Sequence, residues 1–216
     1  MSLTRVPADR QVEADLTRSR PTPAETEQTW LAILQERMPE LRLHSDRVAS
    51  LAQIVGEDMG LRPRELTMLR SVAELHDLGK LIIPRAILDR AGPLDGGEWA
   101  LLHTHTVVGQ RLLESIPGFE QVARLTRSTH ERWDGAGYPD GLAGTQIPLG
   151  SRIVFVCDAF DAMTSPRPYR RAMTSQTALG KLQKGAGTQF DARVVRVLSA
   201  IVAECEPAPS AVPALN

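Results

Sequence analysis

The sequence predicts an all-α protein that folds as one helical domain. Aromatic residues make up only 4% of the 216 residues, which is few for an all-β sandwich and ordinary for a helical protein. Apolar residues recur at three- and four-residue intervals through most of the chain, the pattern of amphipathic helices. The length and the 42% apolar content suffice to bury a core, and they exclude wholesale disorder.

Helix-start and helix-stop residues mark the elements of the first half. The run Thr22-Pro23-Ala24-Glu25 is a capping box with proline at the first helical position, so a helix begins there. Gly60 ends the second helix, and Pro63 begins the third. Asp95, with Glu98 three residues later, caps a longer helix. The helices predicted here span residues 22–38, 40–59, 63–76, 85–90 and 95–116.

The second half contains one long irregular segment between helices. Glycines and prolines are so frequent from Trp133 to Gly150 that this stretch is predicted to be a loop. The segment from Ser151 to Met163 fits either a helix or a buried strand, and its apolar run Ile153–Cys157 does not decide between them. The other predicted helices span residues 119–131, 175–184 and 191–203.

The expected domain organisation has four parts. Residues 1–21 and 206–216 lack periodicity and are predicted to be flexible segments. Residues 22–39 form an N-terminal helix, for which dimerisation, a stump of a signalling connector and plain packing remain alternatives. Residues 40–205 form the main domain.

Charge and cysteine content exclude several classes of protein. The net charge of −1 gives no basic field for a nucleic-acid polymer. No apolar run approaches the roughly 20 residues that cross a bilayer, so no membrane association is expected. The two cysteines form no disulfide framework, which favours a cytoplasmic location.

Histidines and carboxylates stand at positions that predict a metal centre. His76-Asp77 is a vicinal pair at the end of an apolar helix, and His44 lies on the apolar stripe of another helix, one turn after Glu40. Any one of these residues alone is commonly a hydrogen-bonded core residue or a surface pair. Together they supply nitrogen and oxygen ligands for hard or borderline divalent metals. The candidate ligands are Glu40, His44, His76, Asp77, His105, His130 and Asp158.

These residues, in order, resemble a known family. His76-Asp77 together with Trp133-Asp134-Gly135-Ala136-Gly137-Tyr138-Pro139 resembles the HD-GYP subgroup of HD-domain metal-dependent phosphohydrolases, and the resemblance runs from about Glu40 to about Val197. It implies an HD-domain helical bundle core with additional C-terminal helices and a Gly/Pro-rich GYP loop. It also implies hydrolysis of cyclic di-GMP to linear pGpG, GMP or both. The implied cofactors are divalent metal ions, two in number, iron or manganese, with nickel and magnesium as alternatives.

The resemblance also implies a role for each candidate ligand. His44, His76, Asp77 and Asp158 correspond to ligands of a first metal, and Asp77 would bridge to a second one held by His105 and His130. Glu40 corresponds to the extra carboxylate of members with a third metal. Thr129 replaces a histidine of the usual motif, so we expect two metals, or a weakly held second ion. His103 is interpreted as a bystander.

Other residues are predicted to act on the substrate or to recognise partners. Asp77 and Lys80 are the predicted catalytic residues, and Lys80, one turn after Asp77, is placed to neutralise phosphate charge. Arg167 and Arg170 offer forked donors to a phosphate or a guanine edge. Tyr138 is predicted to line the substrate cleft. The resemblance implies a GGDEF-type diguanylate cyclase as a partner of the GYP loop, and a homodimer remains open.

Two alternatives to cyclic di-GMP hydrolysis remain at this point. The first is a catalytically weak regulatory module that keeps the fold and binds cyclic di-GMP or a diguanylate cyclase. The second is an HD hydrolase that acts on another nucleotide or phosphate ester.

Overall fold

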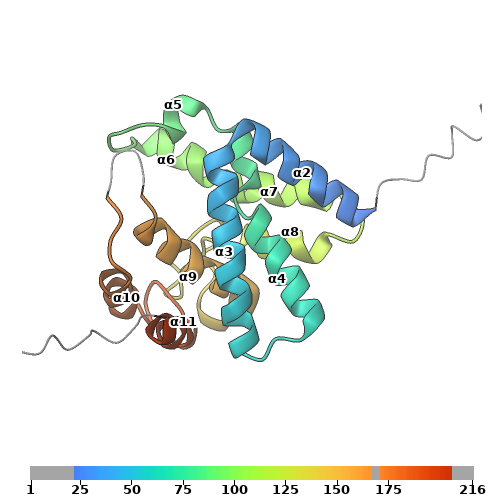
Figure 1. The fold of residues 1–216 in the computed structure, drawn as a ribbon. Coiled ribbons are helices and arrows are strands. Elements are labelled where there is room, and N and C mark those ends of the chain that lie inside the picture. The colour runs from blue at the N-terminus through green and yellow to red at the C-terminus, as the bar shows by residue number, and fades with distance from the viewer. Residues whose placement is uncertain (1–21, 167–170, 206–216) are drawn as a thin grey trace, which may run out of the picture.

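The all-α prediction is confirmed by the structure, a computed structural model that describes residues 22–166 and 171–205 (Figure 1). In these ranges extended pairing is limited to two isolated bridges, Asp134 with Ala143 and Ala186 with Phe190. The two segments predicted to be flexible, and also Arg167 and Arg170, lie outside the described residues. None of the helices within those ranges combines the length and the apolar character that a membrane crossing requires.

The element boundaries follow local sequence signals. Thr22 and Glu25 form both hydrogen bonds of the predicted capping box, and Asp95 and Glu98 form another. Gly60 has a φ of 80°, a conformation that side chains beyond glycine rarely adopt. In order, the elements are α2 Pro23–Arg37, α3 Pro39–Asp58, α4 Pro63–Leu75, the 3₁₀ helix η1 Leu78–Ile82, α5 Arg85–Leu88, α6 Gly96–His103, α7 His105–Glu114, α8 Glu120–Arg127, the 3₁₀ helix η2 Gly144–Gln146, α9 Leu149–Thr164, α10 Ser175–Lys184 and α11 Ala192–Cys205.

Two predicted helices need correction. The helix expected over residues 95–116 is two helices that break at Thr104. There the Thr104 hydroxyl donates to the Leu101 carbonyl (2.7 Å), and the Nδ1 atom of His105 lies 2.8 Å from the Leu102 carbonyl oxygen. The helix expected to reach residue 131 ends at Arg127, because the next turns tighten to three-residue spacing. The ambiguous segment at 151–163 is helical and belongs to α9.

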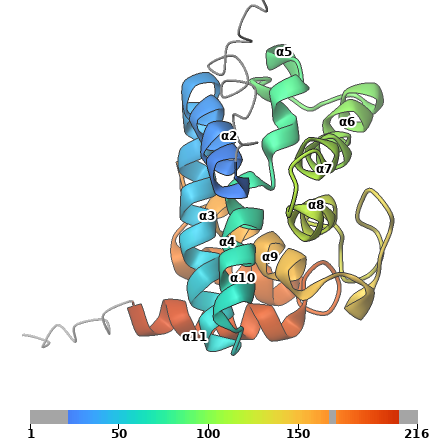
Figure 2. The same ribbon diagram turned by 90° about the vertical axis from the view of Figure 1, so that its right-hand side faces the viewer.

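Helix α3 is the centre of the packing, with α4, α9 and α2 around it (Figures 1 and 2). Its buried face meets apolar side chains of these neighbours in one core, and each fully buried aliphatic side chain stabilises the fold by about 1.5–3 kcal/mol. Leu31 and Leu34 of α2 are buried in the same core, so the N-terminal helix packs against the rest of the domain. This packing places the C-terminal end of α4 beside α3 and α9.

Candidate metal centre

The His76-Asp77 pair lies at the turn between α4 and η1. His76 is 0% and Asp77 2% exposed, so both side chains are held inside the protein. The Nδ1 atom of His76 lies 2.8 Å from the Ala73 carbonyl oxygen, which can only accept. The proton is therefore on Nδ1, and Nε2 faces Asp77 Oδ2 at 3.4 Å. A carbonyl that fixes the outer ring nitrogen in this way is typical of metal-ligating histidines.

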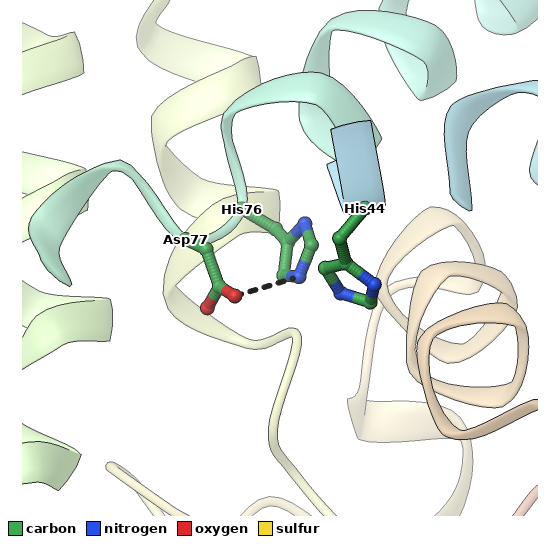
Figure 3. A group of neighbouring side chains, drawn as sticks. All are labelled: His44, His76 and Asp77. Carbon is green, nitrogen blue, oxygen red and sulfur yellow. Dashed lines mark ion pairs between the residues drawn. The ribbon is translucent and has the colours of Figure 1, made fainter. Parts of the chain in front are cut away.

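Helix α3 brings His44 to this pair from a distant part of the chain. The ligand atoms of His44, His76 and Asp77 all lie within 4.8 Å of one another (Figure 3). His44 Nε2 also lies 3.1 Å from Oδ1 of Asp158, which α9 supplies. Three helices thus converge on one buried point.

A second donor group shares Asp77 with the first. It consists of Asp77, His105 at the start of α7 and His130 just after α8. Asp77 Oδ1 lies 3.2 Å from His105 Nε2 and 3.8 Å from His130 Nε2, whereas Oδ2 faces His76 and Lys80. The two oxygens of Asp77 therefore point to different groups, which is the arrangement of a bridging carboxylate.

The buried donor atoms fit divalent cations. Four side-chain atoms that point into the two groups have no hydrogen-bond partner: His76 Nε2, Asp77 Oδ1, His105 Nε2 and His130 Nε2. An unsatisfied buried polar group costs about 1–3 kcal/mol, so four that converge require an explanation. Imidazole nitrogen and carboxylate oxygen are suitable ligands for iron, manganese, nickel or zinc. Ligation of divalent metal would satisfy all four atoms.

The carboxyl groups of the site are kept ionised, which suits the binding of a cation. Burial opposes ionisation of Asp77, but Lys80 and His76 together hold the pKa of that carboxyl well below its usual range. Burial is likewise outweighed at Asp158, where hydrogen bonding to His44 lowers the pKa. For His44, burial is outweighed by Asp158 and Asp161, which raise its pKa to about 9. Metal binding at His44 therefore has to displace a proton, so it becomes weaker as the pH falls.

The other predicted site residues differ in whether they contact the two donor groups. Lys80 Nζ lies 2.5 Å from Asp77 Oδ2, an ion pair between residues one turn apart, and the predicted role of Lys80 toward phosphate stays a prediction. Asp158 contacts His44 of the first donor group, but it is a member of neither donor group. Glu40 is exposed and also belongs to neither, so its role as ligand of a third metal stays a prediction. Thr129 is buried, and its hydroxyl donates to the Thr126 carbonyl (2.9 Å).

Sequence reasoning missed a carboxylate that orients His44. Asp161 Oδ2 lies 2.6 Å from His44 Nδ1, and both oxygens of Asp161 accept hydrogen bonds from Arg47. Asp161 is three residues after Asp158 in α9, one turn along the same face. That spacing was the available signal, because two carboxylates on one face can hold both nitrogens of one imidazole.

His103, interpreted as a bystander, is part of an aromatic stack at the centre. Its ring stacks on Tyr138 with a centroid separation of 3.8 Å, and Tyr138 stacks in turn on His130 at 5.3 Å. The rings are nearly parallel, at 12° and 11°. Tyr138 thus contacts a candidate metal ligand directly, and its predicted contact with substrate stays a prediction.

Replacing Tyr138 by Leu is expected to weaken metal binding at the second donor group by about 10- to 100-fold, because His130 loses the ring that orients it. Tyr138→Phe keeps that ring and should bind metal as the unaltered protein does. The measurement is metal titration in competition with a chromophoric chelator. Equal metal affinity in the Leu and Phe variants would contradict this role.

The loop that carries Tyr138 is held by a buried carboxylate. Glu131 is 2% exposed, and its oxygens accept the backbone N–H groups of Asp140 (2.7 Å) and Leu142 (3.1 Å). The other side of the loop is tied by its backbone, since the N–H groups of Trp133 and Asp134 donate to the carbonyls of residues 189 and 188. The loop is therefore fixed against the fold at both edges.

Glu131→Gln is expected to lower the free energy of unfolding by about 1–3 kcal/mol, because an amide NH₂ cannot accept a hydrogen bond and leaves one loop N–H unpaired against a buried side chain. Urea unfolding measures the change. Glu36→Gln, at an exposed position of α2, is the matched control and should change stability by less than about 0.5 kcal/mol.

A buried His-Asp pair, of which Asp77 is shared by two groups of metal-type donors, lies in a helical frame and defines a helical metal-binding domain. Comparison with known proteins identifies its family. A family model described as HD domain matches residues 28–194. The chain therefore belongs to the HD-domain family, and the predicted resemblance to its HD-GYP subgroup is confirmed.

Two curated relatives share more than a third of their aligned residues with this chain. The cyclic di-GMP phosphodiesterase response regulator RpfG of Xanthomonas campestris is 42% identical over 155 residues, which cover 71% of this chain and 41% of that protein. The 3'3'-cGAMP-specific phosphodiesterase 3 of Vibrio cholerae is 36% identical over 159 residues, covering 74% and 35%. The chain thus spans well under half of either relative.

A solved structure supports the fold independently. A Bdellovibrio bacteriovorus protein described as HDG"Y"P superposes with a TM-score of 0.62 at 18% identity, covering 76% of this chain and 52% of that one. At this identity the likeness concerns the fold alone.

Proposed function

We propose that this protein is a metal-dependent phosphodiesterase that hydrolyses a cyclic dinucleotide. The observation that carries the proposal is the pair of donor groups that share Asp77, each with its ligand atoms within 4.8 Å. His44 and His76 would hold one ion together with Asp77, with Asp158 beside them, and His105 and His130 would hold the other. Divalent ions bound there supply Lewis-acid activation of water and relief of phosphate charge.

The chain's own residues would position the substrate. Lys80 is partly exposed, with 24% of its side chain accessible, and its ammonium group has three N–H donors. One of these faces Asp77, so the others are available to a phosphate oxygen that approaches the centre. Asp77 would contribute a ligand to each of the two ions. We assign Asp77 and Lys80 as the catalytic residues on this basis.

Within this class we propose cyclic di-GMP as the substrate, with pGpG, GMP or both as product. The relative RpfG, described as a cyclic di-GMP phosphodiesterase, supports this choice, while the Vibrio cholerae relative makes 3'3'-cGAMP the second candidate. The proposed cofactors are two ions of iron or manganese. The expectations of a cytoplasmic location, a diguanylate cyclase partner and a homodimer stay predictions.

The test is turnover of both dinucleotides by protein reconstituted anaerobically with iron, manganese or nickel, with products resolved by chromatography. We expect linear dinucleotide or mononucleotide from cyclic di-GMP, faster than from 3'3'-cGAMP. Binding of cyclic di-GMP without turnover under every metal would favour the regulatory module. Turnover of unrelated phosphate esters alone would favour the other HD hydrolase.

A further inference from the structure

A cavity of about 320 Å³ lies beside Lys80, and none of the site histidines lines it. Residues of α5, α6 and the segment between these helices line it, and the two helices lie next to each other in both views (Figures 1 and 2). Its size is at the lower end of the range for small-molecule sites. Lys80 connects the cavity with the candidate metal centre, since it lines the cavity and forms the ion pair with Asp77. The cavity therefore adjoins the proposed phosphate position.

Arg90 lines the cavity, and the fold holds its guanidinium group in place. Arg90 Nη2 lies 2.7 Å from Glu98 Oε1, while Glu98 Oε2 accepts the backbone N–H of Asp95 in the capping box of α6. The cap thus fixes the carboxylate, and the carboxylate fixes Arg90. A guanidinium has five N–H donors, so the pair with Glu98 leaves several for a ligand.

An aromatic face stands at the same cavity. Trp99 lines it and is 48% exposed, although it is among the largest apolar side chains of the chain. Exposed tryptophan beside a cavity indicates a stacking surface, because burying its ring against a flat ligand removes apolar area from water. Apolar side chains, among them Ile87 and Leu102, also line the cavity.

We propose that this cavity binds one guanine base of the substrate, with Trp99 stacked on the base and Arg90 bonded to its O6 and N7 atoms. This inference rests on the proposed function, because the base reaches the cavity from a phosphate held beside Lys80. A forked guanidinium pairs with the two acceptors of guanine. Adenine has an amino group, a hydrogen-bond donor, where guanine has O6. This donor would face the N–H donors of Arg90, which is unfavourable. The cavity thus favours guanine over adenine.

The experiment measures equilibrium binding of cyclic di-GMP and cyclic di-AMP to the full chain by calorimetry, in chelator, so that hydrolysis is absent. Arg90→Ala is expected to weaken binding of cyclic di-GMP by about 5- to 100-fold and to leave cyclic di-AMP unchanged. Trp99→Ala should weaken both by a similar factor, because stacking does not distinguish the bases. Trp99→Phe should recover most of that loss.

Two variants serve as matched controls. Leu101→Ala removes an exposed apolar side chain from the same helix as Trp99, and Arg111→Ala removes an exposed guanidinium from α7; neither residue lines the cavity. Both should stay within about twofold of the unaltered chain.

Three results would overturn the guanine site: unchanged affinity in Arg90→Ala, equal losses in the controls, or no binding of cyclic di-GMP in chelator. The outcome is separable from that of the proposed function. Hydrolysis by the metal-loaded chain without the Arg90 effect removes only the guanine site. Binding that depends on Arg90, without hydrolysis under any metal, removes only the enzymatic proposal.

Discussion

Asp77→Asn is expected to reduce bound metal to less than about one ion per chain and to lower turnover of cyclic dinucleotide by at least about a thousandfold. Asn keeps the volume of the side chain but carries no charge and offers only one oxygen. Both donor groups include Asp77, so a single substitution removes a ligand from each. The pair with Lys80 is also lost, which leaves that ammonium without its fixed position. Metal content by mass spectrometry and product formation are the two measurements.

The control for this prediction is Asp58→Asn, which removes an exposed carboxylate from the end of α3. It should leave metal content and turnover unchanged. Full metal content in Asp77→Asn would contradict a shared bridging ligand, whereas lost metal with retained turnover would contradict metal dependence itself. The two readouts therefore separate the site from its proposed chemistry.

Gly79→Ala is expected to lower the free energy of unfolding by about 3 kcal/mol or more. A Cβ atom at this position would lie 2.0 Å from the His105 carbonyl oxygen and 2.8 Å from the Gly109 backbone nitrogen. Both contacts are with backbone, so no side chain can rotate away. Helix α7 must shift from η1, and His105 then moves away from Asp77. We expect weaker metal binding at the second donor group in whatever fraction still folds.

Urea unfolding and metal titration check this prediction, with Gly180→Ala as the matched control. A Cβ at Gly180 in α10 meets nothing within 4 Å, so alanine there should stabilise the helix by about 0.5–1 kcal/mol. Wild-type stability in Gly79→Ala would show that η1 and α7 are further apart than this structure places them.

Local signals in the sequence were sufficient for most helices. The capping boxes at Thr22 and Asp95, and Gly60 after α3, act within one turn of the chain, so no tertiary contact is needed to recognise them. The break at Thr104 was not predicted, because it depends on side chains that compete with the helix for its own carbonyls. Periodicity also left α9 undecided, since a helix buried on most sides has no polar stripe.

The candidate site was predictable where its ligands follow one another along the sequence in a recognisable order. His76 and Asp77 are adjacent, and His105 and His130 stand in a motif, so the residues themselves indicated the centre. The roles of Asp161 and His103 were not predictable in this way. Each acts by touching a residue distant in sequence, Asp161 on His44 and His103 on Tyr138.

The sequence by itself determined the helical class and the family and indicated the candidate donor residues, because these depend on composition, periodicity and motif order. Only the tertiary structure decided which oxygen of Asp77 faces which histidine, which rings stack, and that a cavity with Arg90 and Trp99 adjoins Lys80. Such relations depend on distances between segments that are remote in the chain, and those distances are set by how the helices pack around α3.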